Sequence, residues 1–332
     1  RAIYNVYSTS DDRIWVGTVS DLCYFDSKDT DLILSGKKNV NHMFIQDIYW
    51  GISNPTVYCV FEDSFKNVWI GSNGGGASFI SSTSSFFHSW RINKIPGVTN
   101  GLNDKEVLTI CVADNGNIWM GTDGGGINVN IDGRNCMFYS HDTGDISSNT
   151  YHSSLKDSNG DLWFGNMYNE MGIDVFISKE GRFIHYTPQG NGSVIYCLFE
   201  DNQRNVWIGS NNGLEIYNLI TKKKDFLNKE NSQLLTNEIK AVSQDKNGNI
   251  WIGTLNKGIS IYNPESKTMK HINEHTIFEN CVINQIFRDS KNRIWIATTE
   301  GLVLFPNEQS DTYQLFNTQN GLACNLICSI EE

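Results

Sequence analysis

The sequence predicts an all-β protein, a seven-bladed β-propeller of four-stranded antiparallel blades. A recurrent tryptophan motif is the first observation, because a regular period of 40–50 residues is typical of propellers and solenoids. Short apolar runs separated by Asn, Asp and Gly are the second, and no segment shows helical periodicity. Seven of the nine tryptophans occupy the motif, at spacings of 54, 50 and then 44 residues: Trp15, Trp69, Trp119, Trp163, Trp207, Trp251 and Trp295.

The copy around Trp207 shows the first half of the repeat. The apolar run Val194–Phe199 predicts a first strand that is buried on both faces. Asp201 follows, and we expect its carboxylate to cap a tight turn by accepting backbone N–H bonds two or three residues on. The second strand carries Trp207, and Gly209 marks a place where a neighbouring backbone comes close or the strand bends.

Two further strands complete each unit. Gly213–Tyr217 and Gly258–Tyr262 follow Gly-rich turns and predict third strands, and Gly181–Tyr186 and Thr268–Ile272 predict shorter fourth strands. Four short antiparallel strands in each of seven units predict the propeller. A solenoid would need a helix or a shorter coil period.

The recurrent side chains are better explained by packing than by chemistry. We expect the tryptophans to form the core between blades and the Asp turns to be capped turns, since a calcium loop needs several spaced carboxylates. Cys59, Cys197 and Cys328 recur in one apolar setting and are expected to be small buried hydrophobes. The spacing of His271 and His275 does not predict a metal site, and neither metal nor cofactor is expected.

Charge excludes one class of partner. The chain of 332 residues has 37 acidic and 26 basic side chains, a net charge of −11, and its one tight basic run is Lys222–Lys224. A phosphate-binding surface needs clustered basic residues, so no nucleic acid is expected to bind this chain. It begins with Arg and no apolar signal segment follows, so we expect a fragment or a processed form.

Each repeated unit has the pattern Asp-x-x-Gly/Asn-Asn-Ile-Trp-Ile-Gly-Thr followed by Gly-Gly-Ile. These units resemble the two-component-regulator propeller repeat over essentially the whole chain, from Ile3 to Glu332. The resemblance implies the periplasmic sensor region of a hybrid two-component system histidine kinase of glycan-degrading gut bacteria. It also implies a second propeller and further domains in the same polypeptide, a homodimer in the intact protein, and a periplasmic location as part of an inner-membrane protein.

The chain ends and two insertions bear on this organisation. Residues 1–322 are expected to form the propeller, and residues 323–332 to be either the first strand of a following repeat or a ring-closing strand. The first unit is longer than the 44-residue norm around Ser35–Trp50, and the second around Trp90–Asp104. These insertions are either a lip for a ligand or partner, or neutral.

A binding site is expected where the loops between strands two and three, and between strands four and one, converge on one face. Amides and carboxylates beside aromatic rings suit a sugar, whose hydroxyls need donors and acceptors and whose C–H faces stack on rings. The alternative is that each residue is a solvated turn residue. The candidates are Asn73, Trp90, Asp123, His141, Tyr168, Asn211, Asn212, Asn256 and Glu300.

Three functions compete. The first is a non-catalytic module that senses an oligosaccharide and transmits to a kinase outside this chain. The second is a scaffold propeller with no ligand of its own. The third is a glycosidase or lyase, for which the carboxylates on the loop face are Asp123, Glu170 and Glu300. We expect no catalytic residue in this chain and favour the sensor.

Overall fold

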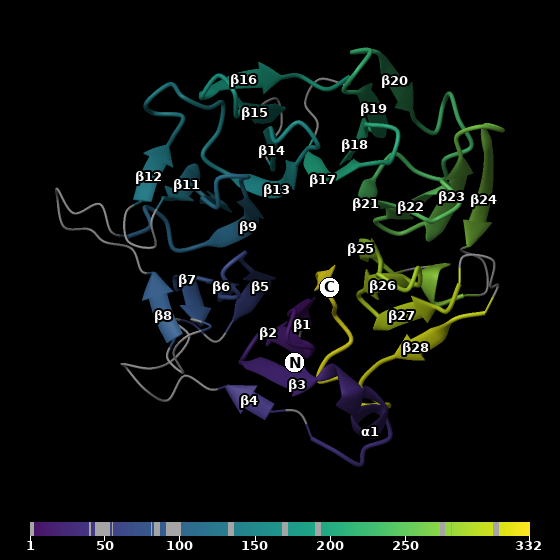
Figure 1. The fold of residues 1–332 in the computed structure, drawn as a ribbon. Coiled ribbons are helices and arrows are strands. Elements are labelled where there is room, and N and C mark those ends of the chain that lie inside the picture. Colours follow the sequence, from purple (N-terminus) through teal and green to yellow (C-terminus); the bar gives the residue numbers. More distant parts are fainter. Residues whose placement is uncertain are drawn as a thin grey trace. The chain divides into compact units, whose positions relative to one another are not determined.

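The computed structural model describes residues 3–39, 41–43, 54, 56–80, 82, 87–90, 101–131, 136–167, 172–189, 194–272, 276–279, 281–307 and 312–332. Over these residues the strands form seven sheets, six with four strands and one with five. Within the four-stranded blades, neighbouring strands pair antiparallel, as in β9 to β12 and β17 to β20, and Figure 1 shows the blades as separate sheets. The chain is a seven-bladed β-propeller, as the sequence predicts.

The first of two compact units comprises Arg1–Tyr151 and Phe316–Glu332. It holds three sheets, with strand orders β29-β1-β2-β3-β4, β5-β6-β7-β8 and β12-β11-β10-β9. The strands are β1 (Ile3–Ser8), β2 (Arg13–Thr18), β3 (Leu22–Asp26), β4 (Asn41–Met43), β5 (Val57–Glu62), β6 (Val68–Ser72), β7 (Gly76–Ile80), β8 (Phe87–Trp90), β9 (Val107–Val112), β10 (Ile118–Thr122), β11 (Ile127–Asn130), β12 (Cys136–Tyr139) and β29 (Ile330–Glu331).

The second unit, His152–Leu315, holds four sheets in which the strands follow chain order. A short 3-10 turn at Ile277–Glu279 precedes the last sheet. The strands are β13 (Tyr151–Lys156), β14 (Leu162–Asn166), β15 (Ile173–Ile177), β16 (Arg182–Tyr186), β17 (Ile195–Glu200), β18 (Asn205–Ser210), β19 (Leu214–Asn218), β20 (Lys224–Leu227), β21 (Ile239–Gln244), β22 (Ile250–Thr254), β23 (Ile259–Asn263), β24 (Thr268–Ile272), β25 (Ile283–Arg288), β26 (Ile294–Thr298), β27 (Leu302–Phe305) and β28 (Gln314–Phe316).

Burial differs between the first and second strands of a blade. Every residue of β6, β10, β14 and β22 is buried. In β17 only Ile195 is buried, and the other five residues are half-buried. The expectation that this first strand is buried on both faces is therefore wrong. The reason is that β17 lies at the edge of its sheet, with a strand neighbour on one side alone.

A buried carboxylate joins each Asp turn to the tryptophan of its blade. Oδ1 of Asp201 accepts the backbone N–H groups of Gln203 and Asn205 at 2.8 and 2.9 Å. Oδ2 of Asp201 accepts Asn205 Nδ2 and Trp207 Nε1, both at 2.8 Å. The capping role is confirmed, with the N–H donors two and four residues on. The Trp207 bond, which the sequence interpretation did not include, fixes the indole in the core.

The same carboxylate-to-indole bond recurs in four other blades. It joins Asp63 to Trp69, Asp157 to Trp163, Asp245 to Trp251 and Asp289 to Trp295 at distances between 2.8 and 3.2 Å. Six of the seven tryptophans are buried, with at most 4% of their surface exposed, which confirms their place in the core: Trp15, Trp69, Trp119, Trp163, Trp207 and Trp251.

Two blades replace this carboxylate. In the first, Trp15 Nε1 donates to the hydroxyl of Thr9 at 3.3 Å. In the third, Ala113 occupies the position six residues before Trp119, and its turn keeps the backbone bonds of the other turns. The acidic residues Asp12 and Asp114 in these two turns do not hold the position of the other carboxylates, because that position, six residues before the tryptophan, is occupied by Thr9 and Ala113.

The glycine two residues after the tryptophan lies where the next blade packs. A Cβ on Gly17 would lie 2.9 Å from the backbone oxygen of Val57, and one on Gly209 would lie 3.0 Å from that of Ile239. The predicted close approach of a neighbouring backbone is therefore confirmed. The seventh blade holds the fully buried Ala297 at this position.

The cysteines behave as hydrophobes. The thiols of Cys59 and Cys197 lie against Gly71 and Gly209, and burial raises the pKa of both thiols to about 12. All eight cysteines are free. A thiol with so high a pKa is inert as a nucleophile near neutral pH.

The first predicted insertion is described in part, because its residues 40 and 44–50 lie outside the described residues. A 3-10 turn, Ser27–Asp29, and the five-residue helix α1 (Thr30–Leu34) lie between β3 and β4. The predicted insertion, Ser35–Trp50, therefore contains the blade's own fourth strand, β4. In the second insertion, residues 91–100 lie outside the described residues.

The C-terminal segment ends beside the N-terminal strand. Strand β29 pairs in parallel with β1, with Val6 opposite Ile330 and Tyr7 opposite Glu331. Figure 1 shows the C-terminus next to β1, whose sheet already has four strands of its own. None of the helices described is long and apolar enough to cross a membrane.

The buried carboxylate predicts opposite effects of two substitutions. Asp201→Ala removes four hydrogen bonds and leaves Trp207 Nε1 buried without its acceptor, and we expect it to lower the free energy of unfolding by about 3 kcal/mol. Ala113→Asp offers Trp119 a carboxylate and is expected to add about 1 kcal/mol. Urea unfolding followed by tryptophan fluorescence measures both. Equal effects on stability in the same direction would contradict this role.

The Asp289 carboxylate predicts a pH dependence. Burial alone would raise the pKa of Asp289, but hydrogen bonds from Trp295 and Arg293 and the charge of Arg293 outweigh it and hold the pKa below 3.8. The ionised form therefore stabilises the fold above pH 3.8, and this contribution is lost as pH falls through the lower folded-state pKa. The free energy of unfolding of the unsubstituted chain should exceed that of Asp289→Asn, and this difference should shrink only below about pH 4. A difference that narrows on raising the pH instead would show that the sign is wrong.

Candidate functional site

The first strands share a β-bulge at the end that carries the loops between blades. In β17, Ile195 pairs with Ser210 and Cys197 with Gly209, which leaves Tyr196 as an extra residue without a partner in β18. A bulge re-aims the side chain of its extra residue. The same register shift gives extra residues in five other first strands, and with Tyr196 they are Tyr4, Tyr58, Leu108, Lys240 and Asn284. We call these the bulge residues.

Two bulge residues of the first unit, Tyr4 and Tyr58, form a cluster with Asn73 and Glu106, which we call the first rim cluster. The rings of Tyr4 and Tyr58 meet edge to face, with centroids 4.8 Å apart. Asn73 Nδ2 donates to the Tyr58 hydroxyl at 2.8 Å. Burial, and then the neighbouring Tyr4 and Glu106, raise the pKa of Tyr58, against which the Asn73 bond acts.

Two bulge residues of the second unit, Tyr196 and Lys240, form the second rim cluster with Glu238. Lys240 Nζ lies 4.0 Å from the centroid of the Tyr196 ring, a cation–π contact between neighbouring blades. Burial and the charge of Glu238 raise the pKa of Tyr196. Each rim cluster thus combines a tyrosine ring with a carboxylate. The first adds an amide and the second adds a cation.

Three predicted residues follow the second strand directly beyond the bulge. The backbone N–H groups of Asn73, Asp123 and Asn211 donate to Thr56, Glu106 and Val194 respectively. The side chain of Asn211 also accepts from Val194 N at 2.9 Å. These positions are therefore held in place by the loop that enters the first strand, and Asn73 belongs to the first rim cluster.

Asp123 and His141 are joined through one loop segment of the first unit. Thr150 pairs with Asp123 and its hydroxyl donates to Asp123 Oδ1 at 3.3 Å. The side-chain oxygen of Asn149 accepts from His141 N at 2.8 Å, and its backbone oxygen accepts from the glycines beside Asp123. His141 itself is exposed.

The remaining predicted residues have mixed outcomes. Asn211 lies four residues after the tryptophan of its blade. Asn212, Asn256 and Glu300 each lie five residues after theirs, and Asn256 and Glu300 are exposed. Trp90 ends the outermost strand β8, opposite Ala77, in a different part of the blade from the bulge residues. Tyr168, like Glu170, lies outside the described residues.

Sequence reasoning missed the bulge residues. They stand eleven residues before the tryptophan, inside a run that was interpreted as a buried strand. The sequence clue was the residue type at this position of the repeat, which is Tyr in three copies, Lys in one and Asn in one. His152 occupies this position in the fourth blade and is exposed.

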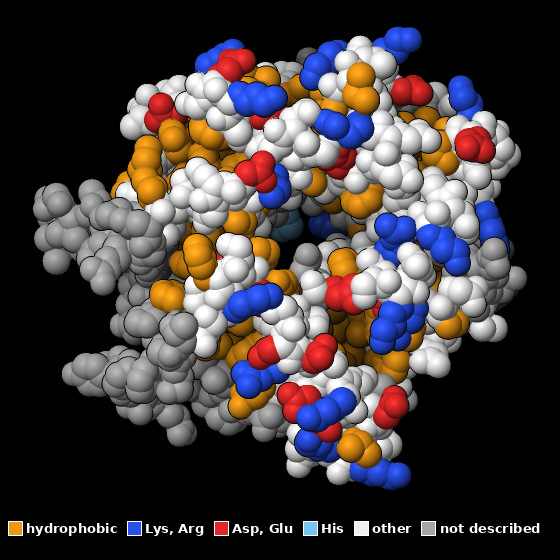
Figure 2. Space-filling model, viewed as in Figure 1, with side chains coloured by type: hydrophobic (Ala, Val, Ile, Leu, Met, Phe, Trp, Pro, Cys, Tyr) orange, Lys and Arg blue, Asp and Glu red, His pale blue; other side chains and the backbone are white. Residues whose placement is uncertain are grey.

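The side chains of the rim clusters offer the contacts that a ligand would need. Tyrosine rings offer apolar faces, and amides, carboxylates and Lys240 offer donors and acceptors, the combination that a hydroxylated ring needs. In the described part of the chain, no three His, Cys, Asp or Glu side chains come together as a metal site. On the face drawn in Figure 2, basic and acidic side chains alternate across the surface.

The fold and the rim define a propeller whose loop end presents a polar and aromatic surface. The family model for the two-component regulator propeller matches residues 51–74, 101–124, 189–212, 233–256 and 277–300. The chain is therefore built from two-component regulator propeller repeats. Every matched segment includes the bulge position and the loop position beyond the second strand.

Two similar solved structures come from Bacteroides signalling proteins. The extracellular domain of the hybrid two-component system BT3049 from B. thetaiotaomicron is 31% identical, with a TM-score of 0.62, over 97% of this chain and 41% of that chain. The extracellular domain of the one-component system BT4673 from the same organism is 20% identical, with a TM-score of 0.54, over 95% of this chain and 49% of that one. This chain thus spans less than half of either structure.

Virginiamycin B lyase from Staphylococcus aureus shares the fold alone. It is 13% identical, with a TM-score of 0.61, over 89% of this chain and 91% of that chain. No curated protein matches the sequence.

The Tyr58–Asn73 bond predicts a measurable ionisation. Because the pKa of Tyr58 is raised, its phenolate should form only above pH 10. Asn73→Ala removes a donor that stabilises the phenolate, so we expect the pKa of Tyr58 to rise further. NMR of 13Cζ-labelled tyrosine, with Tyr58→Phe to assign the signal, gives the titration. A lower pKa in Asn73→Ala would refute the contact.

Proposed function

We propose that the chain is the ligand-sensing propeller of a hybrid two-component signalling protein, located in the periplasm. The observation that carries the proposal is the repeat family together with the 31% identity to the extracellular domain of a hybrid two-component system. The kinase lies outside this chain, with a second propeller and further domains of the same polypeptide. The intact protein acts as a homodimer, whose geometry changes when ligand binds.

The ligand that the rim supports best is an oligosaccharide. Tyr4, Tyr58 and Tyr196 supply rings against which sugar C–H faces pack. Asn73, Glu106, Glu238 and Lys240 supply the polar groups that fix hydroxyl positions. Adjacent blades contribute to each cluster, so that successive sugar units can contact successive blades.

Binding rather than catalysis is the role proposed for these residues. The likeness to virginiamycin B lyase is at 13% identity and concerns the fold. A signal is generated by a ligand that stays intact and binds one conformation better than another. A saccharide that binds should therefore be recovered unchanged.

Calorimetry tests the proposal. Titration of the chain with a panel of plant and host oligosaccharides should give a ligand with a dissociation constant between roughly micromolar and millimolar. Tyr58→Ala or Tyr196→Ala should weaken it at least about tenfold, because each loses a stacking face worth more than about 1 kcal/mol. Chromatography of the ligand after incubation should show no cleavage.

A matched aromatic variant provides the control. Phe65 lies in the Asp turn at the other end of the blade that carries Tyr58, and 72% of it is exposed. Phe65→Ala should leave binding unchanged. Binding unaffected by both tyrosine variants would refute the rim site, and absence of any saccharide ligand would favour a scaffold role for this propeller.

A further inference from the structure

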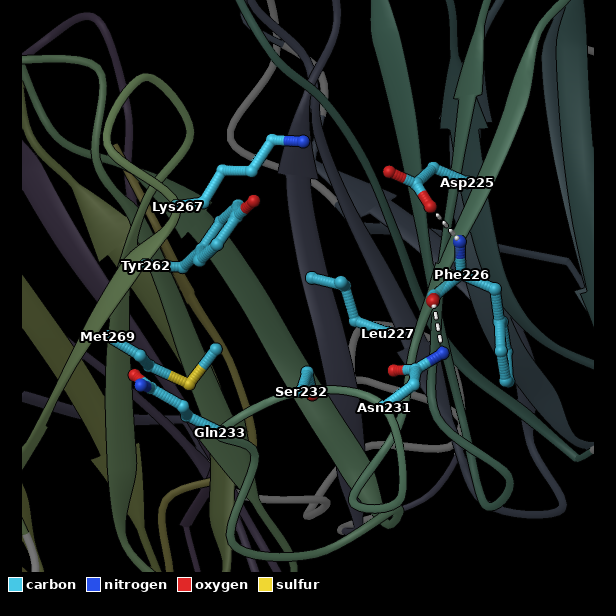
Figure 3. A pocket seen from close by; sticks show the side chains of 9 residues that line it. All are labelled: Asp225, Phe226, Leu227, Asn231, Ser232, Gln233, Tyr262, Lys267 and Met269. Atoms are coloured by element: carbon cyan, nitrogen blue, oxygen red, sulfur yellow. Dashed lines mark hydrogen bonds between the residues drawn. The ribbon is translucent and has the colours of Figure 1, made fainter.

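A hollow lies in the second unit, at the outer strands of two neighbouring blades and away from the rim residues. It has a volume of about 460 Å³ and opens between β20 of one blade and β23–β24 of the next (Figure 3). In Figure 3, Tyr262 and Lys267 stand on one side, Asp225 and Asn231 on the other, and Leu227 lies between them. We call this hollow the outer groove. Its lining residues are Asp225, Phe226, Leu227, Asn231, Ser232, Gln233, Tyr262, Lys267 and Met269.

The neighbouring groove, between β16 and β19–β20, is closed by a side chain. The rings of Tyr186 and Tyr217 meet edge to face with centroids 5.2 Å apart. The Tyr186 hydroxyl donates to the buried Glu215, and Lys224 Nζ lies 4.0 Å from the centroid of the Tyr186 ring. Burial, and then Glu215, raise the pKa of Tyr186, as expected for a phenol locked into this contact.

Strand registers show why the outer groove is open. In the blade of Tyr186, Tyr186 pairs with Ile173, which pairs with Gly165. In the next blade, Leu227 pairs with Leu214, which pairs with Gly209. Because Gly165 and Gly209 each lie two residues after the tryptophan, Leu227 holds the position of Tyr186. By the same pairing, Tyr262 corresponds to Tyr217 and Met269 to Lys224. A leucine therefore stands where the neighbouring groove has its closing tyrosine.

Three polar side chains of the outer groove are open to a ligand. In the described part of the chain, the Tyr262 hydroxyl and the Gln233 amide make no hydrogen bond, and Lys267 makes no ion pair. Lys222 is the counterpart of Lys267 in the closed groove, and its Nζ lies 5.7 Å from the centroid of the Tyr217 ring. Burial and the charge of Asp225 raise the pKa of Tyr262, so its hydroxyl stays a donor at neutral pH.

The loop that forms one wall is held in shape before any ligand arrives. Asn231 Nδ2 donates to the backbone oxygen of Phe226, and Asn231 Oδ1 accepts from Asn228 N, both at 2.9 Å. The backbone of Lys229 donates to Asn237 Oδ1 at 2.7 Å. A preformed wall lowers the entropy cost of binding.

We propose that the outer groove is a second saccharide site, which takes one hydroxyl-rich ring of monosaccharide size. The C–H groups of the ring pack on Tyr262, Leu227 and Met269, and its hydroxyls bond to the free groups of Tyr262, Lys267 and Gln233. A volume of about 460 Å³ lies within the usual range for small-ligand pockets. The proposal shares the ligand class of the proposed function and uses a different site.

Methyl signals inside the groove provide the test. The full chain, labelled at Met and Leu methyl groups, is titrated with methyl glycosides of glucose, galactose, xylose, arabinose and glucuronic acid. At least one should shift the Met269 and Leu227 signals in a saturable way. Leu227→Tyr copies the closing residue of the neighbouring groove and should abolish the Met269 shift without loss of stability.

Matched lysine variants test the polar contact. Lys267→Met should weaken binding about tenfold, whereas Lys222→Met in the closed groove should leave it unchanged. No Met269 shift with any glycoside, or a shift that persists in Leu227→Tyr, overturns the proposal. Saccharide binding that depends on Tyr58 or Tyr196 would still support the rim, so the two sites fail or hold independently.

Discussion

The bond between a buried aspartate and the indole N–H six residues on is the interaction on which the rest of the structure depends. The carboxylate of Asp63, Asp157, Asp201, Asp245 or Asp289 ties a turn, a second strand and a core tryptophan together. A charge buried in this way is stable because several donors meet it, four in most of these turns and three at Asp157. In these five blades it fixes one end of the blade, and the loops lie at the other end.

The two ends of a blade differ in how much their side chains vary between copies. The Asp end repeats almost unchanged, with Thr9 and Ala113 as its exceptions. At the loop end, the bulge position changes from Tyr to Leu, Lys or Asn, and the strand pairing around it stays the same. The outer groove follows the same logic, because a single exchange of Tyr for Leu opens it while the blades on both sides keep their registers.

The sequence predicted features that repeat and missed features that depend on contacts between copies. The tryptophan period gave seven blades, and the second strands and Asp turns followed from local pattern. The bulge at Tyr58 or Tyr196 could not be predicted, because alternation of apolar residues is blind to one unpaired residue. The outer groove depends on which side chain faces Tyr262 from the neighbouring blade, and that pairing is set by strand register.

A crystal structure of the chain soaked with an oligosaccharide that binds it would test the proposed recognition most directly. Sugar density against the rings of Tyr58 or Tyr196, within hydrogen-bond reach of Asn73 or Lys240, is the predicted result. Density in the outer groove as well would fit the second site. Sugar bound with both rim clusters empty would contradict recognition at the bulge residues and show that the loop end of this propeller serves another purpose.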